Sequence, residues 1–139
     1  MRAAGADAVV IGDLTTAYPF GLYWLIVDSV GGATLSQALR SLDEGGTVVT
    51  LGTTAGKEVS FDAQAFYNTG TTTLYGFILF DEFTGLETAG DGLSRLAALV
   101  AEGRLAPHIG LEADWTEIGD AAQKLLDRAF PGKAVLRVG

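Results

Sequence analysis

The sequence predicts an α/β fold in which parallel strands form a sheet that helices cover on both faces. Short apolar and β-branched runs alternate with stretches of helical periodicity along 139 residues, as in βαβ units. The longest purely apolar run, Leu22 to Val27, shows no polar alternation, which is typical of a strand buried on both faces. A chain of this length is expected to form one domain around one core.

The composition excludes several classes of protein. Hydrophobic residues make up 48% and charged residues 19% of the chain, which indicates a globular protein without a membrane span. A net charge of −8 argues against nucleic acid and against an anionic membrane surface as partners. With no cysteine and one histidine, neither a disulfide nor a zinc site is expected in this segment. The N-terminus has no apolar signal region, so we expect a cytoplasmic protein.

Two strands are expected near the N-terminus. Asp7 to Ile11 is short, β-branched and bounded by glycines, and a loop that contains Pro19 follows it. Leu22 to Ser29 forms the next strand. The two strands should belong to the same parallel sheet.

The segment after Ser29 changes to helical periodicity. Apolar residues recur at i, i+3, i+4 and i+7 and form one face of a helix: Leu35, Ala38, Leu39 and Leu42. Thr34 and Gln37 have the spacing of a capping box at its start, and the pair Gly45-Gly46 is expected to end it.

The middle of the chain predicts two more strands and a short helix. Thr47 to Gly52 is one strand, and Thr71 to Phe80 is another with a glycine inside it. A loop with a short helix around Ala63 to Tyr67 connects them.

The C-terminal third predicts two helices and two extended segments. Gly103 closes an amphipathic helix whose apolar face is Leu93, Leu96, Ala97 and Val100. Ala106 to Leu111 is extended. Asp114 and Glu117 open a further helix, with the core face Ile118, Ala121, Ala122, Leu125 and Ala129. The run KAVLRV ends the chain as a strand, and no linker divides residues 1–139.

Glycine, serine and threonine collect where consecutive strands end, at Ser29 to Gly32 and Gly52 to Gly56, with Phe77 to Phe80 at the end of the next strand. In a parallel sheet these ends lie at one edge, where ligands bind and helix N-termini face anionic or amide groups. Glycines there would let a ligand approach the backbone, although each can also serve only a turn. Neither GxGxxG nor GxxxxGK[ST] is present, so a ligand here would lack its usual phosphate cradle.

Four segments together resemble a known family: VDSVGGATLSQALRSLDEGGTVVTLG, FYNTGTTTLYGFILFDE, LAALVAEGRLAPHIG and GKAVLRVG. Their order and spacing resemble the C-terminal half of the medium-chain dehydrogenase/reductase superfamily, in its quinone oxidoreductase-like, zinc-binding-dehydrogenase branch. The resemblance covers nearly the whole chain.

The resemblance implies a partial Rossmann-type sheet. Members carry an N-terminal substrate domain and a six-stranded nucleotide-binding domain with the strand order 3-2-1-4-5-6. Asp7 to Ile11 would be strand 3, and Leu22 to Ser29, Thr47 to Gly52 and Thr73 to Leu79 would be strands 4, 5 and 6. Strands 1 and 2, the glycine-rich phosphate turn and the substrate domain have no counterpart here. We therefore expect 1–139 to be a single incomplete nucleotide-binding domain that is inactive alone.

The same resemblance implies the site and its cofactor, NADP or NAD. The residues beside the nicotinamide ring and its ribose would be Ser29, Val30, Gly31, Leu51, Gly52, Thr53, Phe77 and Ile78. The cofactor carries the hydride chemistry, so no catalytic side chain is expected in this segment. The complete enzyme would act on a carbonyl compound, a quinone or an alcohol.

Other chemically reactive residues have simpler interpretations. Ser29 lacks the GxSxG context of a nucleophile, and His108 is expected to be an ordinary surface residue. Asp81 and Glu82 are expected to be a solvated loop and capping pair rather than metal ligands. Lys57 alone is weak evidence for a phosphate site.

The missing strands would leave the strand at Leu22 to Ser29 with a bare edge. We expect either that Asp7 to Ile11 pairs beside it or that another chain covers it. By resemblance, a homodimer would form through residues 71–79.

Two alternatives to the oxidoreductase remain open. The chain could be a non-catalytic binding or dimerisation module with a Rossmann-like fold. It could also be a small α/β enzyme that binds a nucleoside or an acyl carrier at the same strand ends.

Overall fold

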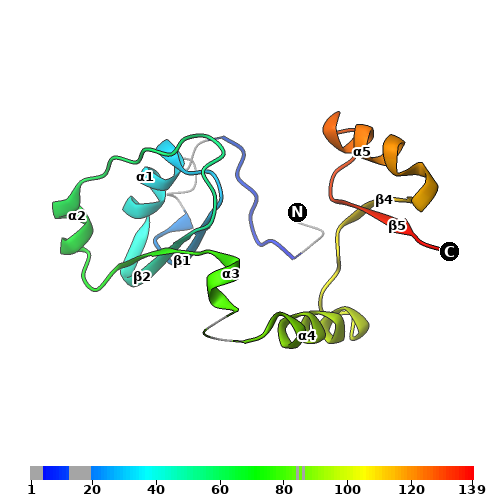
Figure 1. Ribbon diagram of the computed structural model, residues 1–139. Coiled ribbons are helices and arrows are strands. Elements are labelled where there is room, and N and C mark those ends of the chain that lie inside the picture. Colours follow the sequence, from blue (N-terminus) through cyan, green and yellow to red (C-terminus); the bar gives the residue numbers. More distant parts are fainter. Residues whose placement is uncertain (1–4, 13–19, 84, 86) are drawn as a thin grey trace. The chain divides into compact units, whose positions relative to one another are not determined.

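The computed structural model describes residues 5–12, 20–83, 85 and 87–139, which divide into two compact units (Figure 1). The first unit, Met1–Thr88, contains β1 (Tyr23–Asp28), α1 (Gly32–Arg40), β2 (Leu42–Thr50), α2 (Ala63–Asn68), β3 (Thr73–Gly76) and α3 (Leu79–Glu82). The second unit, Ala89–Gly139, contains α4 (Ala89–Ala101), β4 (Ile109–Asp114), the 3-10 helix η3 (Trp115–Glu117), α5 (Ile118–Leu126) and β5 (Lys133–Arg137).

The first unit is built on a parallel sheet with the order β1-β2-β3. Val27 pairs with Val49, and Val49 pairs with Tyr75, so the three strands run side by side in one direction. The predicted α/β class with parallel strands is confirmed. These strands correspond to strands 4, 5 and 6 of the partial Rossmann-type sheet.

A small core lies between this sheet and α1. Its buried members are Leu35, Ala38, Leu39, Leu42 and Val48, and Ile26, Val59 and Phe66 pack against it. Side chains alternate across a strand, so Leu25 and Val27 lie on the face opposite Ile26. They are 56% and 61% exposed, so the prediction of a strand buried on both faces is wrong. A continuous apolar run in the sequence does not show whether a second layer of secondary structure covers the other face of the strand.

The prediction of a strand at Asp7 to Ile11 is also wrong. These residues form no strand, and Ile11 is 93% exposed. A strand is stable only when a neighbour completes its ladder, and the first unit's sheet consists of β1, β2 and β3. The expectation that this segment pairs beside β1 is therefore wrong as well. Pro19, in the predicted loop, lies outside the described residues.

Helix α1 begins and ends earlier than predicted. The N-cap is Gly31, which makes no side-chain hydrogen bond to the helix. The prediction of a capping box formed by Thr34 and Gln37 is therefore wrong, because both residues lie inside the helix. The helix ends at Arg40, and Leu42 belongs to β2.

The glycine pair Gly45-Gly46 shapes β2 instead of ending α1. The register jumps from Tyr23–Leu42 to Leu25–Thr47 at this point, which marks an irregularity in the ladder. Gly45 has a φ of 72°, and a Cβ on Gly46 would lie 2.8 Å from the Asp43 carbonyl oxygen. Gly45 therefore needs glycine because of its positive φ, and Gly46 needs it because a Cβ would collide with the backbone.

The last strand of the first sheet is shorter than predicted. β3 ends at Gly76, and the chain turns into α3 at Leu79. The short helix α2 is confirmed, and the Asp62 side chain accepts a hydrogen bond from the Ala65 N–H at 3.0 Å.

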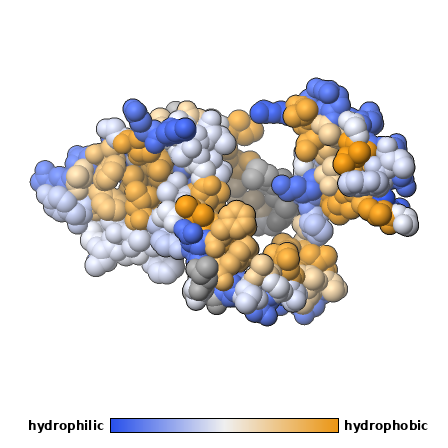
Figure 2. All heavy atoms as spheres, viewed as in Figure 1, coloured by the Kyte–Doolittle hydropathy of each residue, from blue (hydrophilic) through white to orange (hydrophobic). Residues whose placement is uncertain are grey.

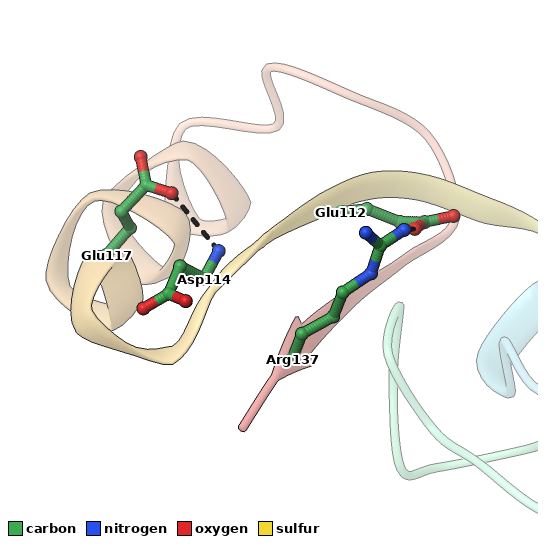
Figure 3. A network of polar contacts seen from close by, with 4 residues as sticks. All are labelled: Glu112, Asp114, Glu117 and Arg137. Atoms are coloured by element: carbon green, nitrogen blue, oxygen red, sulfur yellow. Dashed lines mark hydrogen bonds and ion pairs between the residues drawn. The ribbon is translucent and has the colours of Figure 1, made fainter. Parts of the chain in front are cut away.

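The second unit contains a parallel pair, β4 and β5, with helix α5 between them in sequence. The capping box of Asp114 and Glu117 is confirmed, and Figure 3 shows Glu117 accepting from the Asp114 backbone N–H. Arg137 of β5 pairs with Glu112 of β4 across the two strands (Figure 3). Of the face predicted for α5, Ala121 is buried, and Ala129 lies beyond the end of the helix.

The helix predicted around Leu93 to Val100 is confirmed as α4, and Gly103 follows it with a φ of 70°. None of the helices in the described part of the chain has the length and apolar character needed to cross a membrane. The expectation that 1–139 is a single incomplete nucleotide-binding domain stays a prediction.

Candidate functional site

The ends of β1, β2 and β3 lie side by side at the carboxyl edge of the first sheet. The Leu51 N–H donates to the Asp28 carbonyl oxygen, and the Phe77 N–H donates to the Thr50 carbonyl oxygen, each at 2.9 Å. These bonds continue the ladders of the sheet beyond the assigned strands. The structure therefore brings together the ends of the three strands, where the sequence predicted a ligand site.

The loops after β1 and β2 also bond directly to each other. The Ala55 N–H donates to the Val30 carbonyl oxygen at 2.9 Å, and the Thr54 hydroxyl donates to the Ser29 carbonyl oxygen at 3.3 Å. An isolated parallel bridge joins Gly31 to Gly56. The two loops consequently form one connected rim.

Two glycines allow this close approach of backbone to backbone. A Cβ on Gly52 would lie 2.7 Å from the Ser29 carbonyl oxygen. A Cβ on Gly31 would overlap the Gly56 carbonyl oxygen, and Gly31 also has a φ of 75°. Their structural role is thus to let one loop contact the other.

Asp28 holds the loop after β1 from within. It is 3% exposed, and its carboxylate accepts from the Val30 N–H at 3.2 Å and from the Gly31 N–H at 3.0 Å. Gly31 is the N-cap of α1, so a negative charge already lies at the positive end of that helix. This role of Asp28 was not predicted from the sequence, although an acid at the end of an apolar run is a signal for it.

The predicted site residues differ in accessibility. Ser29, Leu51, Thr53 and Ile78 are exposed, whereas Val30, Gly52 and Phe77 are half-buried and Gly31 is buried. The accessible part of the rim therefore carries two hydroxyls and two aliphatic side chains. Such a surface suits a flat group with an apolar face and polar edges.

Tyr75 and Glu82 fasten the chain on either side of Phe77 and Ile78. The Tyr75 hydroxyl of β3 donates to the Glu82 carboxylate of α3. This hydrogen bond, followed by smaller contributions from burial and from the charges of Glu82 and Asp81, raises the pKa of Tyr75 above 10.0. Glu82 is consequently a partner of Tyr75, which its position in the sequence did not predict.

Polar groups elsewhere in the described residues include His108 and the lining of a hollow in the second unit. No three side chains among His, Asp and Glu there are placed to hold a metal ion. His108 is exposed, as predicted. A hollow of about 300 Å³ in the second unit is lined by Glu112, Ala113, Asp114 and Arg137. Glu112 and Arg137 pair with each other (Figure 3), and the Asp114 side chain accepts a hydrogen bond from the Thr116 N–H at 2.9 Å.

Comparison with protein families identifies the chain. The family model described as zinc-binding dehydrogenase matches residues 4–136. The chain belongs to the zinc-binding dehydrogenase family. The resemblance to the nucleotide-binding half of the medium-chain dehydrogenase/reductase superfamily is thereby confirmed.

Several solved structures share the fold of this chain. A mycobacterial quinone oxidoreductase is 22% identical, with a TM-score of 0.80 over 99% of this chain and 44% of its own. A mycobacterial protein complexed with NADPH is 23% identical, with a TM-score of 0.72 over 99% of this chain and 45% of its own. A Bacillus subtilis protein with NAD bound is 20% identical, with a TM-score of 0.67 over 99% of this chain and 42% of its own.

This chain spans less than half the length of those structures. A comparison with curated protein sequences finds no match.

Proposed function

We propose that this chain is the cofactor-binding part of an NAD(P)-dependent oxidoreductase and holds the nicotinamide end of the cofactor at the rim of its first sheet. The observation that carries the proposal is the convergence of three parallel strand ends, which hydrogen bonds join between Asp28 and Leu51 and between Thr50 and Phe77. In open parallel sheets, ligands bind at such carboxyl ends. The family membership supports the reaction class.

The chemistry of the rim fits the nicotinamide end better than the phosphate end. The buried Asp28 carboxylate already accepts hydrogen bonds from the N–H groups of Val30 and Gly31. A phosphate bound at this position would be repelled by the negative charge of the carboxylate. A nicotinamide ring with its carboxamide is uncharged when reduced, and Ser29 and Thr53 offer hydroxyls to it. Leu51 and Ile78 can pack against the ring.

The role of the chain's own residues is to bind and orient. When bound, the cofactor supplies the hydride, so the protein must hold the ring and exclude water from one face. Val30 and Phe77 would be the half-buried floor, and the backbone of Gly31 and Gly52 would set the depth of approach. No side chain of this segment is proposed to transfer a proton.

Several finer points belong to the same proposal. The substrate of the complete enzyme is a carbonyl compound, a quinone or an alcohol, and the chain alone is inactive. The protein works in the cytoplasm. It forms a homodimer through residues 71–79, because β3 is an edge strand without a charged residue from Thr71 to Phe80.

A non-catalytic binding or dimerisation module is the second candidate. The observation that favours it is the uncovered β1, whose Leu25 and Val27 are exposed. Saturable binding of reduced nicotinamide mononucleotide at the rim would favour the cofactor-binding part over this candidate.

The proposed site can be tested by comparing two ligands. The chain is titrated with NADPH and with reduced nicotinamide mononucleotide, while nicotinamide fluorescence is followed. We expect both to bind weakly, with Kd values of roughly 1 mM, because this chain has no phosphate cradle for the adenosine half of NADPH. Ile78→Glu should abolish both signals, whereas Leu126→Glu, an exposed leucine of α5, should change neither. Absence of binding by the mononucleotide at ten times that concentration would contradict the proposal.

A further inference from the structure

A buried negative charge lies inside the loop that ends β1. The side chain of Asp28 is 3% exposed. Its carboxylate accepts hydrogen bonds from the N–H groups of Val30 at 3.2 Å and Gly31 at 3.0 Å. Val30 and Gly31 are two of the residues that are proposed to lie beside the nicotinamide ring. The loop that would contact the ring is thus the loop that this carboxylate holds.

The positive end of helix α1 offsets only part of this charge. Gly31 is the N-cap of α1, so the carboxylate of Asp28 lies at the helix N-terminus. A helix N-terminus carries roughly half a positive elementary charge, whereas a carboxylate carries a full negative one. The two together therefore leave a net negative charge at the rim. Because the carboxylate is buried, water and salt screen it little.

The other charged side chains near the rim do not remove this excess of negative charge. Lys57 lies just after the loop that follows β2, but it is exposed, so solvent screens its charge. Asp81 and Glu82 belong to α3, which begins directly after the third segment of the rim, and they have the same sign as Asp28. Among the described residues around the rim, negative charge therefore prevails.

We propose that the charge of Asp28 makes the rim bind the oxidised, positively charged form of the nicotinamide ring more tightly than the reduced, uncharged form. This inference rests on the proposed function and deepens it by assigning a direction to the reaction. The two forms have nearly the same shape and the same carboxamide, so only the Coulomb attraction distinguishes them strongly. Asp28 acts through its charge and is not a catalytic residue.

The expected preference is modest. A full charge about 10 Å away, at an effective dielectric constant of about 20, changes a binding constant by roughly fifteenfold, and the helix end removes about half of that charge. We therefore expect the oxidised form to bind roughly fourfold more tightly. For a two-electron couple, this ratio lowers the reduction potential of the bound ring by about 18 mV. The bound reduced cofactor becomes a stronger hydride donor, which favours reduction of a quinone or carbonyl compound over oxidation of an alcohol.

The first test compares the two forms of one ligand on the native chain. Oxidised and reduced nicotinamide mononucleotide are titrated separately, and each Kd is taken from the shifts of the rim amides. Both ligands carry the same phosphate, so its repulsion by the net charge of −8 applies equally to both. We expect the Kd of the oxidised form to be roughly fourfold lower. A reduced form that binds equally well or better would overturn the proposal.

Asp28→Asn separates the charge of this side chain from its structural role. Asparagine keeps one acceptor oxygen for the loop but carries no charge, so the preference for the oxidised form should fall by at least about fourfold and disappear. A loop that is merely loosened would weaken both forms alike and leave the ratio of the two Kd values unchanged. An unchanged ratio would therefore contradict the proposal.

Hydrophilic residues lie on the visible surface of both compact units (Figure 2), so an effect of net charge alone needs its own control. Asp43→Asn makes the same change in net charge at an exposed acid near the start of β2, at the end of that strand opposite the rim. The ratio of Kd values in this variant should equal that of the native chain. The amide spectrum of each variant verifies that it is folded. If Asp43→Asn lowers the ratio as much as Asp28→Asn does, the proposal is overturned.

Failure of this inference is distinguishable from failure of the proposed function. If neither form of the mononucleotide shifts the rim amides, the proposed function itself is wrong, and the inference with it. If both forms bind at the rim with a ratio that Asp28→Asn leaves unchanged, only the inference about charge is wrong.

Discussion

The carboxylate of Asp28 accepts a hydrogen bond from the backbone N–H of Gly31 at 3.0 Å, inside the loop that ends β1. The same carboxylate accepts from Val30, so one buried acid fixes the entry to α1. The motif VDSVGG thus combines a strand end, an internal anchor and a helix N-cap.

Removing this anchor should destabilise the first unit. Asp28→Ala leaves two N–H groups of the loop without their acceptor, and we expect a loss of about 2 kcal/mol in the free energy of unfolding. Asp28→Asn keeps one acceptor oxygen and should lose about half as much. Urea denaturation measures both, with Ser29→Ala, at an exposed neighbour, as the control. Equal stabilities of Asp28→Ala and the control would show that the buried carboxylate does not hold the loop.

Gly52 should not tolerate even a methyl group. In Gly52→Ala the new Cβ would meet the Ser29 carbonyl oxygen at 2.7 Å, and separating the two loops should cost about 1–3 kcal/mol. Gly76→Ala is the matched control, because a Cβ there has no heavy atom within 4 Å. Thermal unfolding compares the two variants. If they unfold at the same temperature, the two loops can separate without cost.

Periodicity and turn chemistry predicted much of the fold. The face of Leu35, Ala38 and Leu39, the short helix at Ala63 and the capping box of Asp114 and Glu117 all occur as predicted. These features depend on residues a few positions apart. Local sequence was therefore sufficient to find them.

The errors concern features that depend on distant contacts. Asp7 to Ile11 has the composition of a strand but no partner strand. Leu42 continues the helical periodicity of the sequence, yet it belongs to β2, where it pairs with Tyr23 of β1. The parallel order of the strands predicted that the site residues lie at one edge of the sheet. The sequence did not predict the anchoring role of Asp28 or the hydrogen bond from Tyr75 to Glu82, because each depends on the geometry of a turn.

The helix cap of the second unit should respond to acid. Hydrogen bonds from the Thr116 hydroxyl and N–H lower the pKa of Asp114 below 3.8, against a small opposing effect of burial. A carboxyl whose pKa is lowered by folding stabilises the fold above its unfolded pKa. That contribution should decline as the pH falls below about 3.8 and vanish below the folded value.

An NMR titration of the Asp114 side chain measures this pKa, and Thr116→Val should raise it. A midpoint of 3.8 or higher in the native chain would contradict the cap. Glu102, which lies outside the cap, provides an internal carboxyl resonance for comparison.

Tyr75 should titrate later than an ordinary tyrosine. Its hydrogen bond to Glu82 raises its pKa above 10.0, so the neutral phenol is favoured in the fold. The associated stability is present below the ordinary pKa and is lost as the pH rises through the folded one. Glu82→Gln should bring the pKa of Tyr75 back toward 10.0, measured by the ring resonances, whereas Asp43→Asn should not. An unchanged pKa in Glu82→Gln would show that the hydroxyl has another partner.

The central claim is that the rim of the first sheet receives a nicotinamide ring. Its most direct test is a residue-resolved amide spectrum recorded while reduced nicotinamide mononucleotide is added. We predict shifts concentrated at Ser29 to Gly31, Leu51 to Thr53 and Phe77 to Ile78, with the second unit unaffected. Shifts confined to residues 89–139, or no shifts at the rim at any ligand concentration, would contradict the claim.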